Sequence, residues 1–239
     1  MLNAGAFDVL TFDCYGTLID WETGILAALW PILAAHGKSL PDAELLELYG
    51  EFEAQAEASP YRSYRDVLAL VVTRFGEHLG FTPTVQEARA LAELLPCWQP
   101  WPDTVAALRR LQGRYRLAII SNIDDDLFAG TRELLEVRFA HVITAQQAHC
   151  YKPGLEIFRK ALAEITAPPN RILHVGQSIY HDVRPAQALG LSTVWVNRSS
   201  PRQNLGAVRR AEGVPDLEVA NMKSLADALL ADEPRTEVQ

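Results

Sequence analysis

Five short apolar runs recur along the chain, and each has the character of a buried β-strand. They are rich in β-branched or aromatic residues and end at turn-forming residues: VLTF (9–12), YRLAIIS (115–121), HVITA (141–145), ILHVG (172–176) and STVWV (192–196). Strands buried on both faces of a parallel sheet are typically continuous apolar runs. Between the runs, apolar residues recur at helical spacing, as in Val105, Leu108 and Leu111, or in Ile157, Ala161 and Leu162. This alternation predicts an α/β protein with a doubly wound, Rossmann-like parallel-sheet core.

One interval in this pattern is too long for a single crossover helix. About a hundred residues separate the first run from the second, and they contain no convincing strand. Amphipathic stretches predict helices over 23–36, 41–58, 64–79 and 85–95. We therefore expect an all-helical insertion over 17–99, with the core formed by 1–16 and 100–239. A helix over 102–113 returns the chain to the core, and the last residues, 233–239, are expected to fray.

Polar residues follow four of the predicted strands, at the edge where open α/β sheets bind their ligands. In chain order they are Asp13, Cys14, Tyr15, Thr17, Ser121, Asn122, Lys152, Gln177, Ser178 and Asp182. The carboxyl ends of parallel strands meet at one edge of the sheet. We therefore expect an acid, a hydroxyl, a lysine and a second acid to converge there.

The motifs at these strand ends resemble those of the haloacid dehalogenase superfamily. They are D-x-Y-G-T-L from Asp13, S-N from Ser121, K-P from Lys152 and Q-S-x-x-x-D from Gln177. The helical insertion is similar to the cap domain of that superfamily, and the resemblance covers essentially the whole chain. FDCYGTLIDWETGI and HVGQSIYHD most resemble type II 2-haloacid dehalogenases and a relative that hydrolyses azetidine-2-carboxylate. The resemblance implies a hydrolase that converts a small carboxylic acid, nominally a 2-haloacid, to a 2-hydroxy acid.

Five residues are candidates for the catalytic group. Asp13 suits a nucleophile, because a carboxylate held in a tight turn and faced by Lys152 stays ionised and oriented, although an aspartate here can also cap the turn. The resemblance makes Asp182 the partner of Lys152 and places the hydrolytic water beside Asp182 and Ser178. Thr17 is a candidate hydrogen-bond donor to Asp13 or, alternatively, a helix cap.

Other residues are candidates for substrate binding. Ser121, Asn122 and the backbone amides of Cys14 and Tyr15 are candidates for holding the substrate carboxylate, and Gln177 belongs to the same group. Trp21 lies at a predicted hinge, where it can line a small pocket or pack in the core.

Three further residues bear on the predicted site. Type II enzymes usually carry an arginine early in the cap that receives the halide, and the matching stretch of this chain has none. Arg65 or Arg62 is the candidate replacement, with a solvated helix face as the alternative. His181 is expected to be a surface residue at a helix start.

Two departures from the superfamily separate carbon chemistry from phosphate chemistry. Its phosphatases carry a general-acid aspartate where this chain has Tyr15, and a magnesium-binding acid where it has Gln177. The sequence therefore predicts a metal-free reaction without a cofactor. A magnesium-dependent phosphatase, azetidine-2-carboxylate ring opening and a non-catalytic protein on an inherited fold remain the alternatives.

Composition and charge limit the classes of partner that the protein can bind. The net charge of −8 gives no basic surface for a nucleic acid, and no window approaches the ~20 apolar residues of a membrane span. Three scattered cysteines favour a reducing compartment, and the N-terminus lacks the basic region of a signal peptide. We expect a cytoplasmic protein whose partners are a small carboxylate substrate and water, with a homodimer left open.

Overall fold

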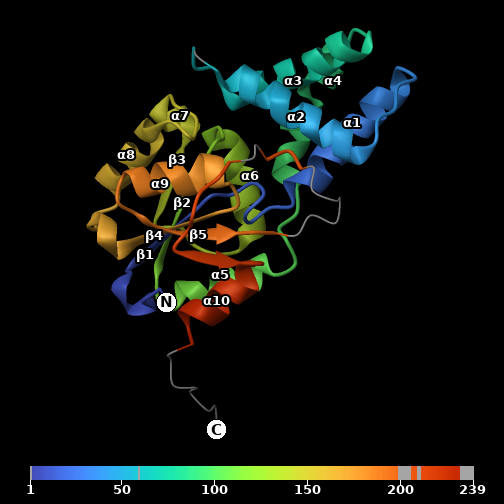
Figure 1. Ribbon diagram of the computed structural model, residues 1–239. Helices are drawn as coiled ribbons and strands as arrows, with labels where there is room; N and C mark the ends of the chain where they lie inside the picture. Colours follow the sequence, from blue (N-terminus) through green and yellow to red (C-terminus); the bar gives the residue numbers. More distant parts are fainter. Residues whose placement is uncertain (1, 59, 199–205, 209–210, 232–239) are drawn as a thin grey trace.

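The sheet of the computed structural model is parallel throughout. The structure describes residues 2–58, 60–198, 206–208 and 211–231 (Figure 1). Within these ranges six strands form one sheet in the order β3-β2-β1-β4-β5-β6. Their bounds are β1 Val9–Phe12, β2 Arg116–Ser121, β3 His141–Thr144, β4 Ile172–Gly176, β5 Ser192–Val196 and β6 Leu217–Val219. Every neighbouring pair is parallel, which confirms the predicted α/β class.

The five predicted strands are present with ends shifted by at most one residue, whereas β6 was not predicted. Only three residues, LEV, form β6, which is too short for a periodic signal. The tail expected to fray, 233–239, lies outside the described residues.

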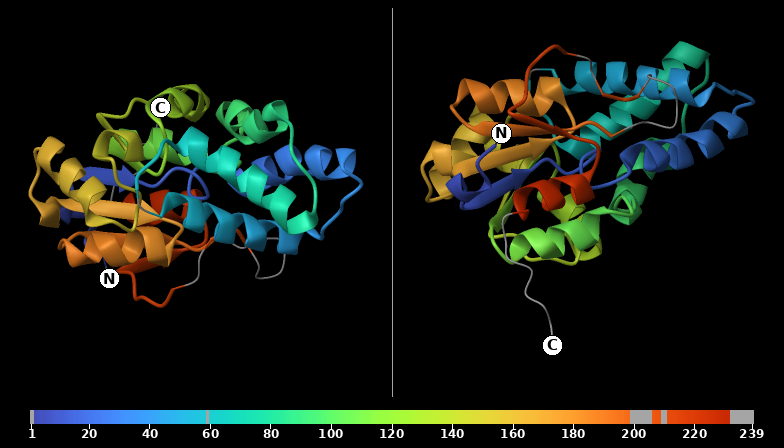
Figure 2. Two further views of the ribbon diagram at one scale, coloured as in Figure 1. Left: turned by 90° about the horizontal axis from the view of Figure 1, so that it is seen from above. Right: turned by 60° about the horizontal axis from the view of Figure 1, so that its bottom comes forward.

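Helices cover both faces of the sheet. On one side lie α8 (Leu155–Glu164) and α9 (Arg184–Ala188), and on the other α5 (Thr104–Gln112) and α10 (Met222–Leu229) (Figures 1 and 2). The connections add α6 (Asp125–Leu135), α7 (Ala145–Ala148), the 3-10 turns η1 (Ala4–Ala6) and η3 (Pro169–Arg171), and the π-helical turn η4 (Ile179–Val183). Strand β1 lies inside the sheet between β2 and β4, so the residue after it, Asp13, leaves from the middle of the carboxyl edge.

The four helices expected between β1 and β2 are also present. They are α1 (Trp21–Ala35), α2 (Asp42–Glu57), α3 (Tyr64–Leu79) and α4 (Val85–Leu94), followed by the 3-10 turn η2 (Leu95–Cys97). Figure 1 shows them grouped beside the sheet rather than on its faces. Local signals define their ends: Ser63 caps α3 through the Asp66 amide, and Thr84 and Glu87 form a capping box on α4.

Two connecting segments run side by side where the helical insertion leaves and rejoins the core. The amide of Asp20 donates to the carbonyl of Gln99 at 2.9 Å, and that of Trp101 donates to Leu18 at 3.0 Å. A third link is the Asp124 carboxylate in the loop after β2, which accepts from the amides of Tyr64 and Arg65 at the start of α3. These contacts place α3 next to the carboxyl end of the sheet.

None of the helices in the described ranges is long and apolar enough to cross a bilayer.

Gly24 of α1 supplies a test of this junction. A Cβ at Gly24 would lie 2.4 Å from the ring of Trp98, well inside contact distance. Replacing a helical glycine with alanine usually stabilises a helix by about 0.5–1 kcal/mol. Here we expect Gly24→Ala to lower the free energy of unfolding by about 1–3 kcal/mol, the usual range for overpacking, measured by urea denaturation.

The control for this substitution is Gly5→Ala, whose Cβ would lie 3.4 Å from Asn3 Oδ1, its nearest neighbour. That variant should keep the wild-type stability. A Gly24→Ala protein as stable as the wild type, or more so, would contradict the close approach of Trp98.

Candidate active site

Asp13 is held at both of its carboxylate oxygens. Oδ1 accepts a hydrogen bond from Lys152 Nζ at 2.7 Å, and Oδ2 accepts one from Thr17 Oγ1 at 2.6 Å. Its backbone amide donates to the Val175 carbonyl of β4 at 2.9 Å. The expected contact with Thr17 is therefore present, and Asp13 has a fixed direction at the end of β1.

Lys152 joins three strand ends. Its ammonium donates to Asp13 Oδ1 and Asp182 Oδ1, each at 2.7 Å, and to the Ile120 carbonyl of β2 at 3.1 Å. These are all three donors of an ammonium. The side chain of Lys152 is 2% exposed, so a buried cation here is compensated by two carboxylates.

Asn122 positions the lysine rather than pointing only at the cavity. Its Oδ1 accepts from the Lys152 amide at 2.7 Å, and its Nδ2 donates to the Lys152 carbonyl at 3.2 Å. Both halves of the side-chain amide therefore bind the backbone of the loop after β3. The same side-chain amide is the predicted contact for the substrate carboxylate, so that role would compete with these two bonds.

Asp182 is buried at the start of the helical region after β4. Besides the contact with Lys152, its Oδ2 accepts from the Ser178 amide at 3.2 Å, and His174 Nε2 lies 3.3 Å from Oδ1. Gly176 at the end of β4 makes room, because a Cβ there would lie 2.5 Å from the Asp182 side chain. A glycine at this position is therefore required for the acid to reach Lys152.

The three charged groups shift one another's ionisation. Burial acts to lower the pKa of Lys152, but Asp13 and Asp182 outweigh it and raise the pKa above its ordinary value. Burial acts to raise the pKa of Asp182, but Lys152 and His174 hold that pKa well below its usual range. Burial and the charge of Asp182 raise the pKa of Asp13, against Lys152 and Thr17. Asp182 is thus the more firmly ionised carboxylate of the pair.

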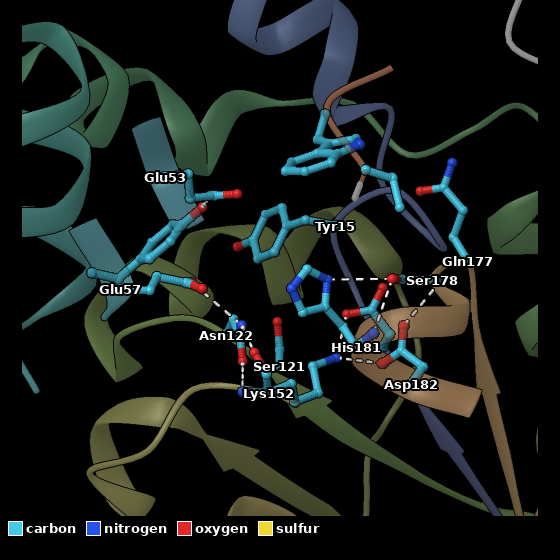
Figure 3. Close-up of a pocket in the computed structure, with 14 residues that line it drawn as sticks. Tyr15, Glu53, Glu57, Ser121, Asn122, Lys152, Gln177, Ser178, His181 and Asp182 are labelled. Atoms are coloured by element: carbon cyan, nitrogen blue, oxygen red, sulfur yellow. Dashed lines mark hydrogen bonds and ion pairs between the residues drawn. The ribbon is translucent and has the colours of Figure 1, made fainter. Parts of the chain in front are cut away.

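A small cavity opens above this group (Figure 3). Its free space is about 60 Å³, several times the roughly 10–15 Å³ that one water needs on this measure. It therefore suits a molecule of a few heavy atoms. The predicted residues that line it are Asp13, Tyr15, Trp21, Ser121, Asn122, Lys152, Gln177, Ser178 and Asp182.

Three predicted residues do not line the cavity. Cys14 and Thr17 are fully buried, and the Thr17 hydroxyl donates to Asp13 and accepts from the Gln177 amide at 2.9 Å. The guanidinium of Arg65 pairs with Asp126 at 2.6 Å, and its side chain is 46% exposed. The expectation that Arg65 receives a leaving group is corrected by this position, because α3 presents that side chain to α6.

His181 is a further correction. It was expected at the surface, yet it is half-buried and lines the cavity. Ser178 caps η4 by accepting from the His181 amide at 3.0 Å, and Ser178 Oγ also lies 3.3 Å from His181 Nδ1. The ring is thus folded back over the Ser178 hydroxyl (Figure 3).

Tyr15 has a hydroxyl that is already engaged. It lies 2.8 Å from Thr131 Oγ1 of α6, and burial raises the pKa of this phenol well above its ordinary value. A Tyr15 held in this way is a poor substitute for the general-acid aspartate of a phosphatase.

The helical insertion contributes residues that the sequence analysis missed. Glu53, Glu57 and Tyr64 line the cavity, together with Val208. Burial raises the pKa of Glu53 to about 7 against its hydrogen bonds from Tyr64 and Tyr49. Burial and the nearby Glu53 raise the pKa of Glu57 well above its ordinary value. A signal existed, because Glu53 falls on the apolar face of a helix that also buries Tyr49.

The residues present do not fit a magnesium ion. No cluster of three or more His, Cys, Asp or Glu side chains in the described ranges is arranged to hold a metal. Asp13 and Asp182 both bind the Lys152 ammonium, and Gln177 stands where the resemblance places a magnesium-binding acid in the phosphatases. Magnesium prefers carboxylate oxygens in a near-octahedral set, which this group does not supply.

A parallel-sheet core with the Asp13–Lys152–Asp182 group buried at its carboxyl edge is the arrangement that the resemblance to the haloacid dehalogenase superfamily predicts. A profile of the haloacid dehalogenase-like hydrolases matches residues 7–190, and the chain belongs to this family.

Known relatives agree with this assignment. The chain is 27% identical to an (S)-2-haloacid dehalogenase of Pseudomonas putida, over 92% of this chain and 97% of that protein. It is 32% identical to haloacid dehalogenase-like hydrolase domain-containing protein 3 of Mus musculus, over 81% and 83% of the two chains. A solved structure of L-2-haloacid dehalogenase from Xanthobacter autotrophicus, with chloropropionic acid covalently bound, shares the fold. Its TM-score is 0.78 at 17% identity, covering 95% of this chain and 100% of that one.

The buried Asp13–Lys152–Asp182 group leads to a prediction about the stability of the protein. Lys152→Met leaves Asp13 and Asp182 buried without their cation, which typically costs about 3–5 kcal/mol. The two carboxyls then take up protons more readily in the folded than in the unfolded state, so folding is favoured as the pH falls. We expect a large deficit in unfolding free energy at pH 8 that narrows towards pH 5, measured by urea denaturation across pH.

The matched control is Lys160→Met, which removes a surface lysine paired with Glu164. Such a pair contributes about 0–1 kcal/mol, and its loss should show little dependence on pH over this interval. A Lys152→Met deficit that stays constant from pH 8 to pH 5 would show that the two carboxylates do not share one buried cation.

Proposed function

We propose that this hydrolase acts by nucleophilic substitution at an aliphatic carbon, with an ester on Asp13 as the intermediate. The observation that carries the proposal is a carboxylate fixed at both oxygens at the base of a small cavity. The resemblance makes a 2-haloacid the nominal substrate and a 2-hydroxy acid the product. The covalently bound chloropropionic acid of the Xanthobacter autotrophicus enzyme supports an intermediate of this kind.

In the first step an oxygen of Asp13 attacks the carbon from the side opposite the leaving group. The new C–O bond forms as the carbon–halogen bond breaks, and the halide leaves with the electron pair. Attack from behind inverts the carbon, so an L-2-haloacid gives a D-2-hydroxy acid. A fixed carboxylate at near-attack distance replaces a dilute, poorly oriented water, an advantage that can reach about 7–11 kcal/mol.

In the second step water attacks the carbonyl carbon of the Asp13 ester. Asp182 accepts a proton from this water, and Ser178 helps to orient it. Lys152 offsets the negative charge that develops on the ester oxygen. The C–O bond between Asp13 and the substrate carbon stays with the product. The acyl–oxygen bond breaks, and the proton taken up by Asp182 passes to the departing alkoxide oxygen. The other proton of the water is released to solvent as the hydroxy acid leaves and the Asp13 carboxylate is restored.

The metal requirement separates this mechanism from that of a phosphatase. Because Lys152 occupies both acids and Gln177 replaces a third, we expect hydrolysis to survive excess EDTA. The measurement is a panel of 2-chloropropionate, fluoroacetate, azetidine-2-carboxylate and a generic phosphate ester, with and without chelator. Activity on the phosphate ester that is lost with EDTA and restored by magnesium would contradict the mechanism.

Isotope labelling tests the ester directly. In a single turnover in ¹⁸O-labelled water, with enzyme in excess and with any substrate of the panel that reacts, the label should enter the Asp13 side chain. The first product should carry unlabelled oxygen. We also expect Asp13→Asn to lower kcat by about 10⁴-fold or more, as when a covalent nucleophile is removed.

The alternative route, direct attack by water on the substrate carbon, places the label in the other molecule. Direct attack by water would place ¹⁸O in the first product, and an Asp13→Asn variant that keeps full activity would agree with it. Mass spectrometry of the Asp13 peptide distinguishes the two.

A further inference from the structure

The wall of the cavity contributed by α2 carries two carboxyls. Glu53 and Glu57 are four residues apart and therefore lie on the same face of this helix (Figure 3). Glu53 Oε1 accepts hydrogen bonds from Tyr49 at 3.0 Å and Tyr64 at 2.5 Å. Both hydroxyl donors bind the same oxygen, so the other oxygen of Glu53 has neither of these bonds and is available to the cavity.

Glu57 is held from the core side. Its Oε1 accepts from Asn122 Nδ2 at 3.3 Å, and Asn122 is also bound to the Lys152 backbone. The Glu57 carboxyl is therefore tied to the same loop that carries the catalytic lysine. The acids of α2 and the group around Asp13 belong to one cavity.

The charges around the cavity are unbalanced. Four carboxyls line it, those of Asp13, Asp182, Glu53 and Glu57, and among the described lining residues the one permanent cation is Lys152. Its three donors are already used by Asp13, Asp182 and the Ile120 carbonyl. With no cation paired to them among the described residues, burial raises the pKa of Glu53 and Glu57, so their charged forms are disfavoured in the cavity. A bound cation would favour the ionised carboxylates, whereas a substrate carboxylate would be repelled by them.

A buried hydroxyl in the same cavity also lacks a partner. Ser121 is 1% exposed, and its Oγ has no hydrogen-bond partner among the described residues. Figure 3 shows the side chain directed into the cavity. A buried polar atom without a partner in a native site requires an explanation, and a hydroxyl oxygen can accept from an N–H group.

We propose that Glu53 and Glu57 bind a positively charged nitrogen of the substrate, an alkylammonium group, with Ser121 as a further acceptor. The proposal deepens the proposed function, since it rests on Asp13 as the nucleophile for the electrophilic carbon of the same molecule. The substrate class is then a small aliphatic electrophile that carries a protonated amine. A simple 2-haloacid carries a carboxylate and would need a positively charged binding group. Here the binding groups, the carboxylates of Glu53 and Glu57, are negatively charged.

Unreactive probes of similar size and opposite charge test the binding. Propylammonium and propionate are titrated into the wild-type protein by calorimetry. We expect propylammonium to bind and propionate to bind at least about tenfold more weakly, a difference of about 1.4 kcal/mol. Glu53→Gln and Glu57→Gln keep the shape of each side chain, and each should weaken propylammonium about tenfold or more.

Glu47→Gln is the matched control, because Glu47 is an exposed glutamate on the same helix. It should bind both probes as the wild type does. If Glu53→Gln fails to fold, as judged by circular dichroism, Ser121→Ala replaces it and should also weaken propylammonium. Propionate binding as tightly as propylammonium, no binding of either probe, or Gln variants with unchanged affinity would overturn the proposal.

A reactive pair separates this proposal from the function on which it rests. 2-Chloroethylammonium and chloroacetate are offered at equal concentration, with chloride release and the mass of the Asp13 peptide as readouts and Asp13→Asn as background. We expect 2-chloroethylammonium to react faster than chloroacetate. Reaction of chloroacetate alone at Asp13 overturns the cation site and leaves the ester mechanism standing. Propylammonium binding without modification of Asp13 by either electrophile supports the cation site and overturns the ester mechanism.

Discussion

The buried ammonium of Lys152 between Asp13 and Asp182 is the interaction on which the rest of the site depends. Removing an ammonium and two carboxylates from water costs several kcal/mol per ion, and only close, fully hydrogen-bonded contacts offset this. Here each Nζ–oxygen distance is 2.7 Å, and the third donor binds the carbonyl of Ile120. Three strand ends must therefore meet within a few ångströms. Asn122 and Gly176 serve this geometry, the first by holding the loop of Lys152 and the second by leaving room for Asp182.

A second electrostatic feature faces the first across the cavity. Glu53 and Glu57 come from a helix of the insertion, so the cavity is closed by acids from two different parts of the chain. Lys152 balances the acids of the core, but no described residue of the cavity balances those of α2. The nucleophile therefore comes from the core, and the second pair of acids comes from the insertion. This separation of chemistry from recognition is expected when function resides in residues placed on a shared fold.

The connection between insertion and core determines whether the two groups share a cavity. Segments 18–20 and 99–101 are joined by backbone hydrogen bonds, and Asp124 binds the first amides of α3. Trp101 adds a bond from its indole nitrogen to the Gly16 carbonyl at 3.1 Å. Packing at the junction is thus the main role of this tryptophan, whereas Trp21 does line the cavity.

The sequence by itself determined the elements and the residues at the strand ends. Apolar runs and helical spacing are local signals, so β1 to β5 and α1 to α4 were predictable, as was the convergence of Asp13, Lys152 and Asp182 at one edge of a parallel sheet. Strand β6 carries too few residues for such a signal.

Only the tertiary structure decided which helix faces meet the strand ends. It turned Arg65 towards Asp126, folded His181 over Ser178, and brought Glu53 and Glu57 to the cavity. The reason is physical: a side chain's direction follows from how its helix packs against distant elements, and the spacing of residues along the chain does not contain that information.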